Sequence, residues 1–123
     1  MANPHDALFK YAFSDVEEAA PLLRAIVPPE LVDEIDWSTL EVSPGSFVDA
    51  TLASRHADIL YEARKGDEAV LLYLLVEHQS TVDRLMAYRM LRYITRIWDR
   101  WLEDHEGAAE LPQIVSIVVY AGE

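Results

Sequence analysis

The chain has 123 residues, 51% of them hydrophobic and 26% charged, which suits one folded domain and excludes a disordered or fibrous protein. It contains no cysteine, so disulfides, zinc ribbons and thiol catalysis are excluded. A formal charge of −12 argues against binding nucleic acid through overall charge, although five of the ten basic residues gather between Arg84 and Arg100.

The first part of the chain is expected to be helical and then extended. Apolar positions at roughly helical spacing predict one or two helices within residues 5–26, with Pro21 marking a kink or a new start. A short helix should follow over residues 28–35, because two prolines and a glutamate resemble a helix opening. We interpret residues 36–39 as a turn or cap, and residues 40–49 as a first strand broken by a proline and a glycine.

Two further strands form a predicted hairpin. Residues 57–63 alternate between apolar and polar or mixed positions, and residues 69–76 form an uncharged apolar run typical of a buried strand. Residues 65–68 supply the turn between them. Glu77 directly follows the apolar run, where a carboxylate is costly to dehydrate unless something pairs with it.

Residues 84–102 form the clearest predicted helix, which should end near Gly107 and be followed by an apolar strand over residues 113–120. Its expected apolar face comprises Met90, Leu91, Ile94, Ile97, Trp98, Trp101 and Leu102. Its opposite face should carry Arg89, Arg92, Arg96 and Arg100. That arginine face is either a solvated surface with ion pairs or a surface that contacts phosphates or an acidic partner.

The expected order is helix, strand, strand, strand, helix, strand. It predicts a single α/β domain over residues 1–123 with a mixed sheet, because a crossover through a helix favours a parallel partner for the last strand. The N-terminus lacks the features of a signal peptide and no apolar run reaches membrane-spanning length, so we expect a cytoplasmic protein without a membrane partner.

The hairpin brings acidic residues together. If the turn is centred on residues 66–67, Asp58 lies opposite Leu75. Strand alternation then places Glu77, and Gln79 while the strand continues, on the same face as Asp58. Asp58 and Glu77 become diagonal neighbours with backbones about 7–8 Å apart.

Two carboxylates at that distance suit a divalent ion such as Mg²⁺, which prefers oxygen ligands. The backbone carbonyl near His78 could complete the protein ligands, and His56 shares the Asp58 face and is a further candidate to touch substrate or metal. The alternative from the residues alone is a pair of solvated acids at strand ends.

Several motifs agree with this arrangement in order and spacing. They are His5 to Lys10, Arg55-His56-Ala57-Asp58, Glu77-His78-Gln79-Ser80, and the helix that runs from Arg92-Tyr93 to Trp98. The chain therefore resembles, over nearly its whole length, the Rpn (recombination-promoting nuclease) family, also labelled putative transposase or YhgA-like. The element order resembles the αβββαβ core of the wider PD-(D/E)XK, restriction-endonuclease-like superfamily.

This resemblance implies a metal-dependent DNA endonuclease, linked in its family to recombination and phage defence. Asp58 and Glu77 would be the ligands of Mg²⁺, or of Mn²⁺ or Ca²⁺ in its place, and DNA would be the partner, held by the arginine face. Gln79 occupies the place where the superfamily usually has lysine, and a glutamine can only orient groups by hydrogen bonds. Lys10 is then a candidate to supply the missing charge.

Two departures from the family pattern carry a second hypothesis. Tyr120-Ala121-Gly122 stands where relatives often show Tyr-His-Gly, and relatives usually carry a further C-terminal region beyond the point where this chain stops. The second hypothesis is a catalytically inactive nuclease-fold module that forms a homodimer or binds a longer relative.

Overall fold

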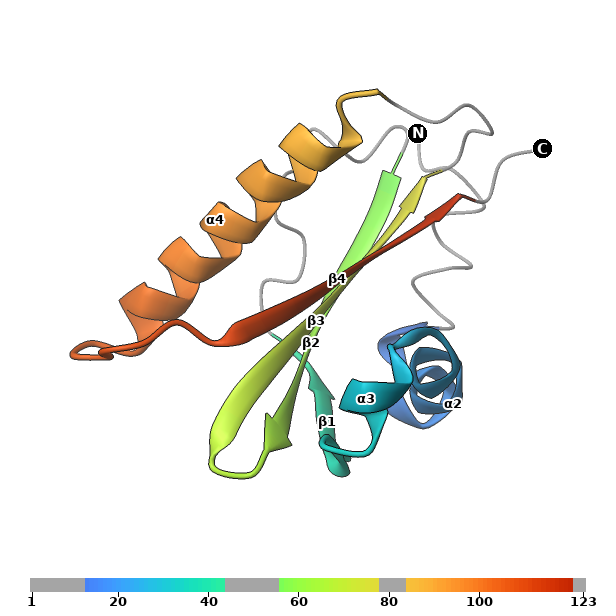
Figure 1. Cartoon of the computed structure of the whole chain (residues 1–123), viewed down its shortest axis with the longest axis horizontal. Helices are drawn as coiled ribbons and strands as arrows, with labels where there is room; N and C mark the ends of the chain where they lie inside the picture. The colour runs from blue at the N-terminus through green and yellow to red at the C-terminus, as the bar shows by residue number, and fades with distance from the viewer. Residues whose placement is uncertain (1–12, 44–55, 78–83, 121–123) are drawn as a thin grey trace.

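The computed structural model of the chain describes residues 13–43, 56–77 and 84–120, with side chains in the second range from residue 58 onward. Its elements in chain order are α2 (Val16–Ile26), α3 (Pro29–Val32), β1 (Asp36–Val42), β2 (His56–Lys65), β3 (Glu68–Glu77), α4 (Met86–Asp104) and β4 (Gln113–Tyr120) (Figure 1). The predicted α/β class and order of elements are confirmed. None of the helices in these ranges is long and apolar enough to cross a membrane.

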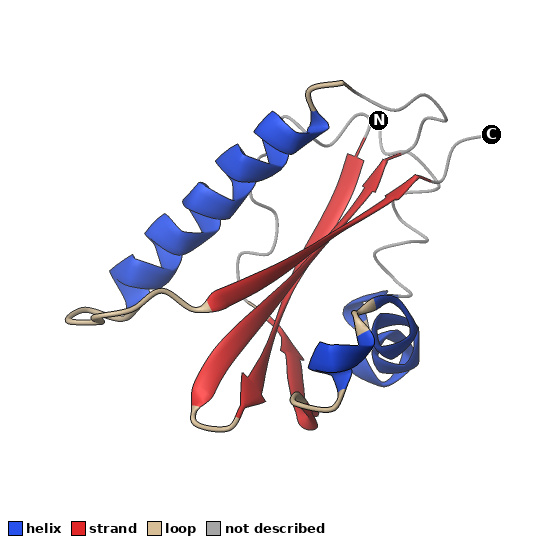
Figure 2. Ribbon diagram, viewed as in Figure 1, coloured by secondary structure: helices blue, strands red, loops and turns tan. Residues whose placement is uncertain are grey.

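The four strands form one mixed sheet in the order β1-β2-β3-β4. The pairs β1–β2 and β2–β3 are antiparallel, whereas β3 and β4 are parallel, as the helical crossover predicted. Helix α4 covers one face of this sheet, and α2 and α3 lie on the other (Figure 2). The turn between β2 and β3 uses Gly66 at a φ of 64°, a left-handed conformation that favours glycine.

The core has two layers because β3 is buried on both faces. Val70, Leu72, Leu74 and Val76 pack with α2 residues such as Leu23 on one side. On the other side Leu71, Tyr73 and Leu75 pack with Leu60 of β2 and with Met90, Tyr93 and Ile97 of α4. The residues of β3 that face α4 alternate with those that face α2, so Glu77 belongs to the α4 side.

The orientation of α4 differs from the prediction. The side chains that α4 buries are those of Met90, Tyr93 and Ile97, whereas Leu91 and Leu102, which we placed on the apolar face, are exposed. The predicted stripe was rotated in part, since Met90, Ile97 and Trp101 do pack on the sheet; α4 carries apolar residues around much of its circumference, so spacing alone does not fix the edges of the buried face. The contact with Leu60, Tyr73 and Leu75 selects the buried one.

Two smaller predictions near the N-terminus are also corrected. Asp36 begins β1 directly, where we expected residues 36–39 to form a turn or cap. Helix α2 continues through Pro21, so no new helix starts there, and it begins after Asp15, whose Oδ1 accepts a hydrogen bond from the Glu17 amide at 3.0 Å. The part of the expected first strand beyond Ser43 lies outside the described residues.

Candidate active site

The register of the β2–β3 hairpin is the predicted one. Lys65 pairs with Glu68, and Asp58 pairs with Leu75. Glu77 is two residues beyond Leu75 and therefore shares its face with Asp58. Both carboxylates are buried, with 2% of Asp58 and none of Glu77 exposed. The alternative of two solvated strand-end acids is therefore wrong.

A tyrosine that was not among the predicted site residues holds the first carboxylate. The Tyr73 hydroxyl donates a hydrogen bond of 2.7 Å to Oδ2 of Asp58. Burial, followed by the nearby Asp58 charge, raises the pKa of Tyr73 well above its ordinary value. The hydroxyl therefore remains a donor throughout the neutral range and fixes the Asp58 carboxylate in one orientation. Strand alternation could have predicted this contact, because Tyr73 is a diagonal neighbour of Asp58, on the side of Leu75 away from Glu77.

An arginine of α4 partners the second carboxylate. The Nη2 atom of Arg89 lies 3.3 Å from Oε2 of Glu77. The same guanidinium donates through Nε to the Tyr93 hydroxyl at 3.2 Å and lies 5.9 Å from the centre of the Tyr93 ring. Tyr93 meets the edge of Tyr73, with ring centres 6.3 Å apart. The five side chains thus form one connected polar cluster between the sheet and α4.

Arg89 is the main correction to the predicted site. We placed it with the other arginines on the solvent face of the helix, but its side chain is only 18% exposed and is turned toward Glu77. The rotation of α4 that buries Tyr93 also brings Arg89 to the edge of the sheet face. A buried carboxylate needs a cation or donors nearby, and Arg89 meets that need here.

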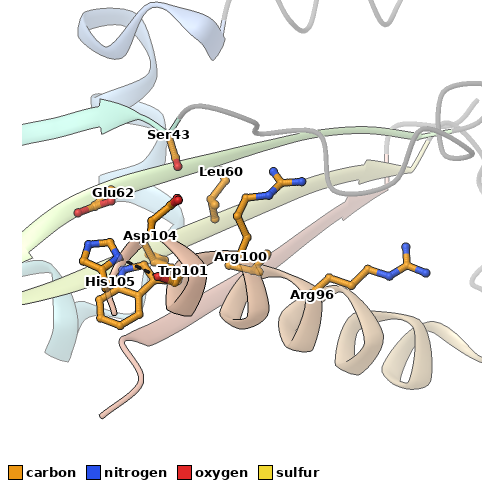
Figure 3. Close-up of a pocket in the computed structure, with 10 residues that line it drawn as sticks. Ser43, Leu60, Glu62, Arg96, Arg100, Trp101, Asp104 and His105 are labelled. Carbon is orange, nitrogen blue, oxygen red and sulfur yellow. Dashed lines mark hydrogen bonds between the residues drawn. The ribbon is translucent and has the colours of Figure 1, made fainter. Parts of the chain in front are cut away.

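The other three predicted DNA-binding arginines are exposed and do not form one patch with Arg89. The guanidinium of Arg92 lies 5.9 Å from the centre of the Tyr88 ring, on the outer side of α4. Arg96 and Arg100 border a cavity of about 230 Å³ beneath the C-terminal half of the helix (Figure 3). The four arginines therefore have three different surroundings: Arg89 is beside Glu77, Arg92 is beside Tyr88, and the other two border the cavity.

Both apolar and polar side chains line this cavity. Leu60, Leu71, Ile97 and Trp101 supply the apolar lining, and Ser43, Glu62, Arg96, Arg100, Asp104 and His105 the polar one. The His105 ring stacks on Trp101 with ring centres 4.0 Å apart (Figure 3). Strand alternation places Asp58, Leu60 and Glu62 on one face of β2, so the cavity begins at Leu60, about 7 Å along that face from Asp58.

The remaining predicted site residues are described only in part. Lys10, Gln79 and the His78 carbonyl lie outside the described residues. The backbone of His56 pairs with Glu77. Within residues 13–43, 56–77 and 84–120, no group of three histidine, aspartate or glutamate side chains gathers in a way that could hold a metal ion.

The residues present nevertheless fit a hard divalent cation. Asp58 and Glu77 are two buried carboxylates on one face, and oxygen donors of this kind suit Mg²⁺. A divalent cation would balance the two negative charges that strand alternation brings to this buried face. The chemistry of the two ligands, together with their burial, is the observation that favours a cation here.

The buried tyrosines predict how stability responds to alkaline pH. Burial also raises the pKa of Tyr61, whose hydroxyl donates to the Phe13 carbonyl at 2.7 Å. Above pH 10, the unfolded chain loses protons that folded Tyr61 and Tyr73 retain, so the free energy of unfolding should fall by about 2.7 kcal/mol per pH unit. Urea unfolding between pH 9 and 12 measures this slope, and Tyr61→Phe should halve it. An equal slope in the variant would contradict the assignment.

The comparisons with known proteins agree with the motifs. The family model for putative transposases, YhgA-like, matches residues 3–123. Recombination-promoting nuclease RpnC of Escherichia coli strain K12 is 38% identical over 122 residues, covering 98% of this chain and 40% of that protein. Recombination-promoting nuclease RpnD of Escherichia coli O157:H7 is 32% identical over 121 residues, covering 98% and 46%.

A further relative is an inactive recombination-promoting nuclease-like protein, RpnE of Escherichia coli strain K12. It is 31% identical over 122 residues, which cover 99% of this chain and 40% of the relative. The chain thus spans less than half the length of these three curated relatives. No solved structure matches it.

Proposed function

This chain belongs to the family of YhgA-like putative transposases, and we propose that it is a metal-dependent DNA endonuclease with a PD-(D/E)XK core. The observation that carries the proposal is the pair of buried carboxylates, Asp58 and Glu77, on one face of a β-hairpin. The names of RpnC and RpnD support nuclease activity in the family. The order of helices and strands from α2 to β4 is consistent with the proposed core.

In this proposal Asp58 and Glu77 hold Mg²⁺, or Mn²⁺ or Ca²⁺ in its place. The bound ion would activate a water molecule and stabilise negative charge on the phosphate. Tyr73 orients Asp58 through its hydrogen bond, and Arg89 positions Glu77 through their ion pair. Both roles serve the same purpose, because ligands that are fixed by neighbours bind a metal with less loss of freedom.

The proposal assigns three further roles beyond the described side chains. Gln79 would orient the attacking water or the phosphate by hydrogen bonds, and Lys10 would neutralise phosphate charge that Gln79 cannot. The His78 carbonyl would be a third protein ligand for the ion, and His56 a substrate contact. Lys10→Ala should lower cleavage if this assignment of charge is right.

A plasmid assay tests the activity itself. The purified chain should convert supercoiled DNA to nicked and linear forms in Mg²⁺ or Mn²⁺ but not in EDTA. Calorimetry with Mg²⁺ in the absence of DNA separates binding of the ion from cleavage. Metal binding without any cleavage would contradict the endonuclease and retain the site.

The arginines that border the cavity are the proposed contacts to the DNA backbone. Removing one arginine that binds a phosphate should weaken binding to all sequences and reduce the slope of log affinity against log salt by about 1. Arg96→Ala and Arg100→Ala should each show this change in a fluorescence-anisotropy titration of duplex DNA. Arg24→Ala, on the opposite side of the sheet, is the matched control. An unchanged salt slope in both test variants would contradict the assignment.

A second candidate is a catalytically inactive module that binds another chain. It is favoured by the Glu77–Arg89 pair, since Arg89 gives Glu77 a counter-charge without a metal, and RpnE is a named inactive relative. No cleavage and no Mg²⁺ binding, together with a stable dimer, would favour this module over the endonuclease.

A further inference from the structure

The outer face of α4 carries a row of large apolar side chains. Tyr88 is 56% exposed, Leu91 59% and Leu102 40%, and all three point away from the sheet that Tyr93 and Ile97 contact. On a helix with 3.6 residues per turn, Tyr88, Thr95 and Leu102 repeat every seven residues and Leu91 lies beside them. This outer stripe is consistent with contact to another helix.

The charges around the outer stripe are divided by sign along the helix. Arg92 flanks its N-terminal half and Asp99 its C-terminal half, while Arg84 precedes α4 and Glu106 follows it. The last turn of α4 holds no basic residue and the first turn no acidic one. The charges therefore oppose the helix dipole, which favours acids at the N-terminus and bases at the C-terminus.

This distribution of charge destabilises the isolated helix. It becomes favourable when α4 of a second copy packs against it in the antiparallel direction. With Thr95 facing its own counterpart, Tyr88 lies opposite Leu102 of the second copy. Arg92 lies within one residue of Asp99 across the contact, on the same flank of the stripe. All of these pairs occur twice, as two-fold symmetry requires.

We propose that the outer stripe of α4 is the interface of an antiparallel homodimer of this chain. Parallel packing would place the two copies of Arg92 on opposite flanks of the contact, where neither meets Asp99 of the other copy. The contact leaves the Asp58–Glu77 cluster open, since these residues lie on the sheet face that α4 covers and the outer stripe lies on the other side of the helix. The dimer does not depend on nuclease activity.

Analytical ultracentrifugation of the full chain, without metal or DNA, tests the interface. Leu91→Glu should raise the dimer dissociation constant by about a hundredfold, and Arg92→Glu by about tenfold. The double variant Arg92→Glu/Asp99→Arg should restore dimerisation, because it exchanges the signs of an antiparallel pair. A monomeric wild-type chain, or a dimer that none of these changes weakens, would overturn the proposal.

The absence of cysteine allows the direction of the helices to be tested separately. Thr95→Cys should form a disulfide-linked dimer under mild oxidation, since the two positions face each other. Tyr88→Cys alone should not, because its two copies would lie about 21 Å apart along the helices. Mixing Tyr88→Cys with Leu102→Cys should restore crosslinking. Efficient crosslinking by Tyr88→Cys alone would indicate parallel helices and overturn the antiparallel dimer.

Discussion

Glu77→Gln and Asp58→Asn are each expected to lower plasmid cleavage in Mg²⁺ by more than about a hundredfold. Altering a residue that only supports a metal ligand costs up to about a hundredfold, and these two residues are the proposed ligands themselves. Each change removes one negative charge from a buried site and preserves the volume of the side chain. Asp58→Asn also retains an oxygen that can accept the Tyr73 hydrogen bond, so its main effect is on charge. Cleavage rates on supercoiled plasmid, with Mg²⁺ binding measured by calorimetry, report the two effects.

Glu62→Gln is the matched control for this pair. Glu62 lies on the same face of β2, four residues beyond Asp58, and borders the cavity rather than the carboxylate cluster. The control should retain cleavage within about threefold of the wild type, as expected for a half-exposed acid that does not contact the ion. Full activity in either Asp58→Asn or Glu77→Gln would remove that residue from the metal site.

The sequence predicted the hairpin well because its signals are local. Gly66 fixes the turn, and strand alternation then determines which side chains share the Asp58 face. The parallel pairing of β4 followed from the helical crossover, which restricts how the chain returns to the sheet. These features depend on chain geometry, and they placed Asp58 and Glu77 together.

The side of α4 that faces the sheet could not be derived in the same way. A search for apolar periodicity includes Leu91 and Leu102, yet both are exposed in the structure. Tyr93 packs against the sheet instead, and its hydroxyl bonds to a charged side chain. Spacing alone places Arg89 on the solvent face. Only the knowledge that Glu77 is fully buried shows why an arginine would turn inward. The missed part of the site is therefore the part that depends on contacts between elements.

Arg89→Met is expected to lower the free energy of unfolding of the metal-free protein by about 3 kcal/mol, at the low end of the cost of breaking a buried ion pair. The reason is that the buried Glu77 side chain would lose its ion pair with the Arg89 guanidinium. The low end applies because Arg89 is itself 18% exposed. Urea unfolding in EDTA measures the change, and Arg24→Met, on α2 at the opposite side of the sheet, is the matched control.

Two additions distinguish the removal of a counter-charge from a loss of packing. In the double variant Arg89→Met/Glu77→Gln most of the stability should return, because replacing both members of a buried ion pair is often neutral. Saturating Mg²⁺ should raise the stability of Arg89→Met above its value in EDTA, since a cation that binds only the folded state adds stability that grows with its affinity. If the double variant were as unstable as Arg89→Met, the loss would come from the contacts of Arg89 with Tyr93. Glu77 would then be stabilised chiefly by other groups, and the charge argument for a cation beside Asp58 would rest on Asp58 alone.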